Sequence, residues 1–363
     1  MNGVSNPPAP AGVAVPLAPV LHRSRQLLAP WLLACAGLVV VVLVLGGITR
    51  LTRSGLSIVQ WQPIAGAFPP VTEADWQLLF QQYRSSPEFE QVNSGITIEG
   101  FRTIFWWEYA HRLAGRIAGL AFLLPLLWFA FAGVLSRALF VRLAGIFLLG
   151  AVQGVAGWWM VRSGLVEDPS VSPFRLALHL GLALAILGAL LWTSWELRPR
   201  PKRPGPAVRF PAVLVLFVVL VAFSGALMAG ARAGLAYNTF PLLNGALVPE
   251  DVLRLSPWYE NFQRNPATIQ LLHRALALVL ILVSLGAWLR MRATPPRGAP
   301  FRTSGWFLLA LAVQAGLGAA NVLASVPLGV AILHQALAVG LFCLALRLAF
   351  LGRPEAAGRA PSG

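Results

Sequence analysis

The sequence predicts an all-α integral membrane protein with eight transmembrane helices, arranged as two tandem, pseudo-symmetric four-helix bundles. Composition is the first observation, because 57% of the 363 residues are hydrophobic and only 11% are charged, too apolar for a soluble globular chain. The second is eight apolar runs of membrane-spanning length. In lipid such runs must be helices, since every backbone N–H and C=O needs an internal partner. The third is an internal repeat that relates the first four runs to the last four.

The eight apolar runs give the expected positions of the helices. Each is near 20 residues long, which matches the thickness of a bilayer core. We expect the spans near Trp31–Ile48, Tyr109–Ala132, Leu139–Val161, Phe174–Trp195, Pro211–Gly230, Ala267–Leu289, Gly305–Leu323 and Leu328–Phe350.

The net charge of +15 reflects membrane topology and does not indicate a nucleic-acid partner. Basic residues cluster in alternate connections, which all lie on one side if the eight spans alternate in direction. This positive-inside pattern predicts that both termini face the cytoplasm. The clusters contain Arg23, Arg25, Arg137, Arg142, Arg198, Arg200, Lys202, Arg203, Arg209, Arg290, Arg292, Arg297, Arg302, Arg353 and Arg359.

The same pattern divides the chain into domains. Residues 1–28, rich in Pro and Ala, are expected to form a disordered cytoplasmic tail. An N-terminal bundle (29–200), a cytoplasmic linker (201–210), a C-terminal bundle (211–352) and a cytoplasmic tail (353–363) follow. The first span lacks a signal-peptide cleavage pattern, and the tail has too few Arg for a mitochondrial presequence, so the bacterial inner membrane is the expected location.

Four short motifs recur in the same order in both halves. Arg53-x-Gly55-Leu56 recurs as Arg232-x-Gly234-Leu235, and His111–Arg112 recurs as His273–Arg274. The two remaining matches are Ala151–Val152–Gln153-x-x-x-Gly157 with Ala312–Val313–Gln314-x-x-x-Gly318, and Leu178–His179-x-x-Leu182–Ala183 with Leu333–His334-x-x-Leu337–Ala338. An even number of spans per unit makes the repeat parallel. In the long outer segment Leu51–Trp107, Thr72-x-x-Asp75 predicts a capping box at the start of a short amphipathic helix.

Four histidines are the candidate metal ligands, one in each even-numbered span: His111, His179, His273 and His334. Even spans all run from outside to inside, which places the four at similar depth near the outer face. Two imidazoles from facing helices can ligate one heme iron, and bundle cores are established heme sites. A lone transmembrane His is more often a packing residue, but ionisable groups at matched repeat positions favour ligands. Zinc would need more clustered ligands.

Glu108 lies three residues before His111 and shares its helix face. It is interpreted either as a carboxylate placed over a heme edge or as a helix-start Glu paired with Arg112. The second half has Gln270 at this position, and the asymmetry favours a function for Glu108 in the first half. Six arginines near these motifs could bind heme propionates or extend to the membrane interface: Arg50, Arg53, Arg112, Arg116, Arg232 and Arg274.

Several longer motifs together resemble the heme A synthase family, in its proteobacterial and mitochondrial branch. The first half contains Gly46–Gly47–Ile48–Thr49–Arg50–Leu51–Thr52-x-Ser54–Gly55–Leu56, Pro87–Glu88 and Glu108–Tyr109-x-His111–Arg112. The second half contains Tyr237–Asn238–Thr239–Phe240–Pro241–Leu242, Gln270-x-x-His273–Arg274 and His334–Gln335. The similarity extends from about residue 30 to residue 350.

The resemblance implies an enzyme that oxidises the C8 methyl of heme O to a formyl group by successive hydroxylation, for a-type cytochrome oxidases. It implies heme b in the C-terminal half with His273 and His334 as axial ligands. Heme O would be the substrate in the N-terminal half, with His111 and His179 at its iron and Glu108 as the essential carboxylate. Heme O synthase, cytochrome oxidase assembly factors and a second copy of the chain are the conceivable partners.

Two other functions remain open from the sequence. One is a di-heme electron-transfer cytochrome of the membrane, which would use His pairs but no substrate-specific Glu. The other is a transporter or assembly factor in which the histidines are structural.

Overall fold

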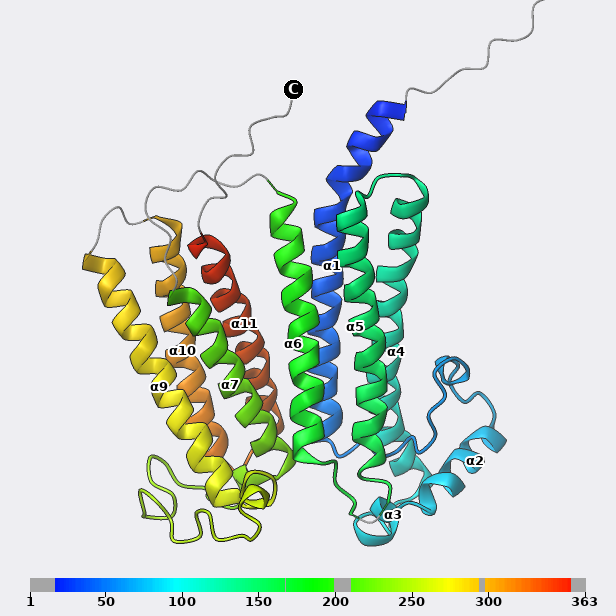
Figure 1. Ribbon diagram of the computed structural model, residues 1–363. Coiled ribbons are helices and arrows are strands. Elements are labelled where there is room, and N and C mark those ends of the chain that lie inside the picture. The colour runs from blue at the N-terminus through cyan, green and yellow to red at the C-terminus, as the bar shows by residue number, and fades with distance from the viewer. Residues whose placement is uncertain (1–16, 167, 199–209, 294–297, 354–363) are drawn as a thin grey trace, which may run out of the picture.

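The computed structural model describes residues 17–166, 168–198, 210–293 and 298–353, and these residues fold into helices joined by loops (Figure 1). Eight of the helices in these ranges are long and apolar enough to cross a membrane, as predicted. They are α1 (Leu17–Leu51), α4 (Ile98–Phe131), α5 (Arg137–Arg162), α6 (Pro173–Glu196), α7 (Phe210–Gly230), α9 (Pro266–Ala293), α10 (Ala299–Leu323) and α11 (Leu328–Gly352).

The long helices stand in two groups of four, α1, α4, α5 and α6 beside α7, α9, α10 and α11 (Figure 1). In the first group α4 and α6 each pack on α1 and α5, so α4 and α6 lie diagonally across the bundle. In the second group α9 and α11 stand in the same relation, with α7 and α10 between them. The even-numbered spans of the sequence are therefore the diagonal helices, which can direct side chains into the core from opposite sides.

The two groups meet along α6 with α7 and along α1 with α11. One apolar cluster includes residues of both groups, among them Leu187 of α6 and Phe342 of α11. Hydrogen bonds also cross the seam, as we call this interface between the two groups. Gln335 Nε2 donates to the carbonyl of Leu43 (2.7 Å), and Arg50 Nη1 donates to the carbonyl of Ala229 (2.8 Å). A Cβ at Gly47 would collide with the Gln335 amide, so glycine is what allows the close approach here.

The N-terminal end differs from the expected disordered tail, because α1 already begins at Leu17. Eight of the twelve residues from 17 to 28 are Leu, Arg, Ala or Gln, which have high helix propensity, so the helix continues upstream of its apolar span. The rest of that tail (1–16), most of the linker (201–209) and the end of the C-terminal tail (354–363) lie outside the described residues.

A helical cap covers the end of the first bundle that is expected to be outside. It consists of α2 (Glu73–Arg84) and α3 (Pro87–Gln91) (Figure 1). The predicted capping box is confirmed, with Thr72 Oγ1 accepting from the Asp75 backbone and the Asp75 carboxylate accepting from that of Thr72. An aromatic cluster holds this cap to the start of α4: Trp76, Tyr83, Phe101, Phe105 and Tyr109.

Helix α4 starts 11 residues earlier than the predicted span, because the Thr97 side chain caps it by accepting from the backbone of Gly100 (3.3 Å). Its first turns extend beyond the apolar run and support the cap. In the second half shorter elements take this place: η2 (Ala233–Leu235), η3 (Trp258–Glu260) and α8 (Asn261–Arg264).

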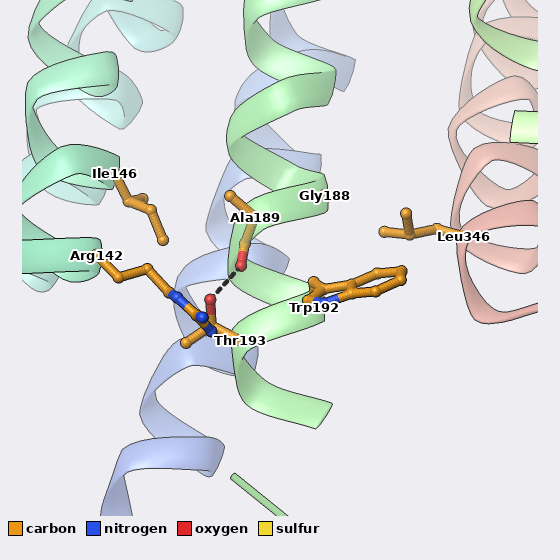
Figure 2. Close-up of a pocket in the computed structure, with 7 residues that line it drawn as sticks. All are labelled: Arg142, Ile146, Gly188, Ala189, Trp192, Thr193 and Leu346. Atoms are coloured by element: carbon orange, nitrogen blue, oxygen red, sulfur yellow. Dashed lines mark hydrogen bonds between the residues drawn. The ribbon is translucent and has the colours of Figure 1, made fainter. Parts of the chain in front are cut away.

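A groove of about 360 Å³ opens between α5, α6 and α11 at the other end of the bundles, where the described chain ends lie (Figures 1 and 2). Its lining residues are Arg142, Ile146, Gly188, Ala189, Trp192, Thr193 and Leu346. None of them is a candidate site residue, and the candidate residues lie instead around the four histidines.

Candidate functional site

The structure brings the four histidines together as two pairs, one in each bundle. His111 of α4 and His179 of α6 lie near each other in the first bundle, and His273 of α9 and His334 of α11 lie near each other in the second. Each pair comes from diagonal helices, so the rings approach the core of their bundle from opposite sides. This is the pairing that the repeat predicted.

Each histidine ring packs on a glycine of the neighbouring helix. A Cβ on Gly46 would lie 2.8 Å from Cε1 of His111, and one on Gly157 would lie 2.8 Å from Cε1 of His179. Gly225 and Gly318 stand in the same relation to His273 (3.2 Å) and His334 (3.1 Å). We call each of these four glycine contacts a glycine niche. Both halves of the repeat therefore contain the histidines and also the glycines that leave space for their rings.

The hydrogen bonds of His111 and His273 fix which ring nitrogen carries the proton. Nδ1 of His111 lies 3.1 Å from the carbonyl of Val42, which can only accept. Nδ1 of His273 lies 2.8 Å from Ser224 Oγ, whose own proton is donated to Val221 O (2.9 Å). Both Nδ1 atoms therefore donate, which leaves the Nε2 lone pair available to a metal.

The other two histidines share a different set of partners. Gln153 Nε2 donates to the backbone carbonyl of His179 (3.0 Å), and Gln314 Nε2 donates to that of His334 (3.0 Å). Nδ1 of each ring and Oε1 of each glutamine are buried without a hydrogen-bond partner. Buried polar atoms without partners are rare in proteins and point to a missing group.

These residues fit a heme. Each bundle offers two imidazole rings as ligands. Nδ1 of His179 and Nδ1 of His334 are buried without a hydrogen-bond partner. Within the described ranges, no group of three or more His, Cys, Asp or Glu side chains comes together in a way that could hold a metal ion. Paired imidazoles suit an iron whose remaining positions a porphyrin supplies.

Glu108 lies on the side of the first pair that faces the helical cap, and it is 2% exposed. Its Oε2 accepts from Ser57 Oγ (2.8 Å) and from the backbone N–H of Ile58 (2.8 Å). Its Oε1 accepts from Nε (3.0 Å) and Nη2 (2.6 Å) of Arg112. The ion pair of one sequence interpretation is thus present, but it is buried and belongs to a larger network that fixes the carboxylate.

Gln270 occupies the corresponding place in the second half and is fully buried. Its Oε1 accepts from Arg274 Nη2 (2.5 Å), and its Nε2 donates to the carbonyls of Ala233 (2.9 Å) and Tyr237 (3.1 Å). In each half, the side chain at this position binds both the arginine four residues later and the neighbouring loop. It is a carboxylate in the first half and an amide in the second.

Four of the six candidate arginines are engaged with backbone carbonyls. Arg112 and Arg116 donate to the loop from Ile58 to Pro63, and Arg274 donates to the loop around Pro241. Arg50 crosses the seam between the bundles. Arg53 and Arg232 differ: both are exposed, and both have a left-handed backbone, with φ of 52° and 50°.

Glu88 is a buried acid that sequence reasoning did not single out. It is 4% exposed and accepts a hydrogen bond from the Tyr83 hydroxyl (3.3 Å). Burial raises its pKa to about 7, and burial also raises the pKa of Tyr83. Glu88 stood in the sequence only as part of Pro87–Glu88, where an acid in a first helical turn needs no special explanation.

Comparisons with known proteins show which family the chain belongs to. The family model described as cytochrome oxidase assembly protein matches residues 29–346. The protein named heme A synthase from Nitrosospira multiformis is 47% identical over 326 residues, covering 88% of this chain and 91% of that protein. Those from Bradyrhizobium sp. (48% identical, 85% and 86% covered) and Azorhizobium caulinodans (46%, 88% and 92%) carry the same name.

Fold and site together define a multi-pass helical membrane protein whose two bundles each bring a pair of imidazoles together in the core. The chain belongs to the heme A synthase family, and its relatives include proteobacterial members, as the sequence motifs predicted.

Proposed function

We propose that this protein is a heme A synthase that oxidises the C8 methyl of heme O to a formyl group by successive hydroxylation, for the assembly of a-type cytochrome oxidases. The observation that carries the proposal is the pairing of four histidines at matched repeat positions in a chain about 45–48% identical to proteins named heme A synthase.

The two bundles have different roles in this proposal. The N-terminal bundle binds heme O as substrate between His111 and His179, and the C-terminal bundle holds heme b between His273 and His334. The asymmetry at one position supports this division, because Glu108 stands where the second half has Gln270. An acid is needed where a methyl group is oxidised and not where a heme only transfers electrons.

Glu108 acts on the reacting carbon in the proposed mechanism. Bound heme supplies the redox chemistry, and the protein supplies position and electrostatics. Oxidation of a methyl group gives its carbon positive character, which a fixed carboxylate stabilises. The same carboxylate can take a proton from the water that supplies the formyl oxygen. Conversion of a methyl to a formyl group with one water releases four protons and four electrons, and the electrons must pass to an external electron acceptor.

Ser57, Ile58 and Arg112 hold the carboxylate in place through the four hydrogen bonds of the network. Because these partners are set before the substrate arrives, little reorganisation is needed during the reaction. The location we propose is the bacterial inner membrane with both termini cytoplasmic. Heme O synthase is the proposed partner that supplies the substrate.

The test is to co-express the protein with a heme O synthase in a host without heme A, extract the hemes and identify them by mass. Heme A in the extract supports the proposal. A di-heme electron-transfer cytochrome would leave only heme O and heme b, and a protein with structural histidines would purify without heme.

A further inference from the structure

Two consecutive backbone carbonyls of α1 bind side chains from different bundles. The carbonyl of Val42 accepts from Nδ1 of His111 (3.1 Å), and the carbonyl of Leu43 accepts from Nε2 of Gln335 (2.7 Å). His111 belongs to α4 of the first bundle, whereas Gln335 belongs to α11 of the second bundle and directly follows His334. The proposed mechanism gives Gln335 no task.

Two adjacent glycines of α1 leave these carbonyls open to a second donor. In an α-helix the side chain of a residue lies beside the carbonyl of the residue four positions earlier. Gly46 and Gly47 lie four positions after the two accepting residues. A Cβ on Gly46 would lie 2.8 Å from Cε1 of His111, and a Cβ on Gly47 would lie 2.6 Å from Nε2 of Gln335. The same short segment of α1 thus fits a side chain of each bundle.

The repeat shows that the fold does not need an amide at this place. Leu180, which follows His179, matches Gln335, and Ala226 of α7 matches Gly47. Leu180 packs against the apolar cluster that contains Ala226, so the other side of the seam is closed by apolar contacts. An amide within a membrane span is costly unless it is hydrogen-bonded, and polar residues there are usually functional. Gln335 therefore needs a reason beyond packing.

His111 depends on α1 more directly than His273 depends on α7. Nδ1 of His273 bonds to Ser224 Oγ, a side chain of its own bundle (2.8 Å). Leu45 stands at the matching place in α1, and no side chain intervenes between His111 and the carbonyl of Val42. The orientation of the His111 ring is therefore set by the position of the α1 backbone itself.

We propose that Gln335 is a positioning residue for the heme O site of the other bundle. Its hydrogen bond fixes α1 at Leu43, and the adjacent carbonyl of Val42 then orients the ring of His111. The inference rests on the proposed function, which assigns heme O to the pair that contains His111. Gln335 acts only through α1, so it transfers no proton or electron and is not a catalytic residue.

This role has a spectroscopic consequence. A carbonyl that accepts from Nδ1 makes the imidazole a stronger ligand, which favours ferric iron and lowers the reduction potential of the heme. Without the bond from Gln335, the contact of His111 with the Val42 carbonyl is less well fixed. Heme O should then bind less tightly, and its reduction potential should rise. The backbone of His334 is held by Gln314, so the heme of the C-terminal bundle should keep its potential.

The experiment compares Gln335→Leu, which introduces the residue of the matching position, with Ser194→Ala. Ser194 Oγ of α6 donates to the carbonyl of Ala29, so this control removes another side-chain hydrogen bond to α1 (3.0 Å). Protein purified with its C-terminal heme is titrated with heme O, and the potentials of both hemes are measured by optical redox titration. We expect Gln335→Leu to bind heme O about 3- to 10-fold more weakly and to raise only the heme O potential. Ser194→Ala should change neither.

A second pair of variants leaves Gln335 in place and moves its amide. Gly47→Ala puts a Cβ against this amide, while a Cβ at Gly37 of the same helix meets no atom within 4 Å. Alanine favours a helix over glycine, so neither variant weakens α1 itself. Gly47→Ala should reproduce the weaker binding and the higher potential, and Gly37→Ala should not. If Gln335→Leu fails to fold, this pair decides.

Unchanged affinity and potential in Gln335→Leu would overturn the positioning role and leave the proposed function standing. Weaker binding without a shift in potential would also overturn it, as would equal losses in Ser194→Ala, because both outcomes indicate general loosening of the helices. No heme O binding by the unsubstituted chain would overturn the proposed function itself, and the positioning role with it.

Discussion

Glu108 and Gln270 occupy equivalent places in the two bundles, and each accepts a hydrogen bond from the arginine four residues later on its helix. In both halves that arginine also donates to a backbone carbonyl of the neighbouring loop, Ile58 in the first half and Thr239 in the second. The protein thus builds the same clamp twice, once with a carboxylate and once with an amide. The arginine side of the clamp needs only an acceptor oxygen, but the loop side differs. Oε2 of Glu108 accepts from Ser57 and Ile58, whereas Nε2 of Gln270 donates to the carbonyls of Ala233 and Tyr237.

We therefore predict that Glu108→Gln folds and still binds heme through all four histidines. The substitution removes the ion pair with Arg112 but keeps an oxygen that can accept from it, so we expect a loss of about 1–2 kcal/mol in the free energy of unfolding. This exceeds the roughly 0.5 kcal/mol of an exposed helical pair, because Glu108 is buried. Thermal unfolding measures the loss of stability, and the optical spectrum measures heme binding. Glu99→Gln, which replaces an exposed acid on the same helix, is the control. A Glu108→Gln protein that aggregates without heme would refute this prediction.

His273→Ala and His334→Ala should each abolish the low-spin heme of the C-terminal bundle. The two rings lie on diagonal helices and form one pair, so removal of either leaves a heme iron with a single protein ligand. The optical spectrum of the purified protein is the measurement, and His111→Ala, in the other bundle, is the control that should keep this heme. A normal bis-histidine spectrum of that heme in both variants would end the assignment.

The glycine niches give a prediction about the substrate bundle. Gly157→Ala places a Cβ 2.8 Å from Cε1 of His179, so the ring must move. We expect a cost of about 1–3 kcal/mol, or roughly 5- to 150-fold weaker heme O binding. Gly154→Ala is a matched control one turn away on α5, because a Cβ there meets no atom within 4 Å. Heme O titration measures both, and equal affinities for the two variants would exclude this role of Gly157.

Reporter fusions test the topology. The tails and the basic loops join helices at one end of the bundles, opposite to α2 and α3 (Figure 1). The helices that end there include α1, α6, α7, α9, α10 and α11. The Arg and Lys distribution assigns that end to the cytoplasm. Reporters fused after Gly363 and within the loop from Arg198 to Arg209 should both report the cytoplasm. An external signal from either one contradicts the predicted orientation.

Much of the fold and the outline of the site could be predicted from the sequence, because both depend on local pattern. Apolar length located the eight spans, and the capping box at Thr72 and Asp75 follows from side chains three residues apart. The pairing of the histidines followed from the repeat, since matched motifs in tandem units occupy matched places.

The remaining features depend on tertiary contacts between distant segments. Nothing near Glu88 in the sequence indicates that its carboxylate is buried, because the aromatic cluster around Tyr83 also includes residues at the start of α4. The tautomer of His273 depends on Ser224 of another helix, and the early start of α4 depends on the cap that it supports. Sequence periodicity contains no information on such contacts.

The most direct test of the central claim compares the chain with Glu108→Gln during co-expression with a heme O synthase. Heme A, heme O and partly oxidised heme are quantified by mass after extraction from equal amounts of folded protein. Loss of roughly 2–4 kcal/mol of transition-state stabilisation corresponds to a rate about two to three orders of magnitude lower. The account predicts heme A from the unsubstituted chain, and heme O or a partly oxidised product from Glu108→Gln. Near-normal heme A from well-folded Glu108→Gln would contradict the role of this carboxylate.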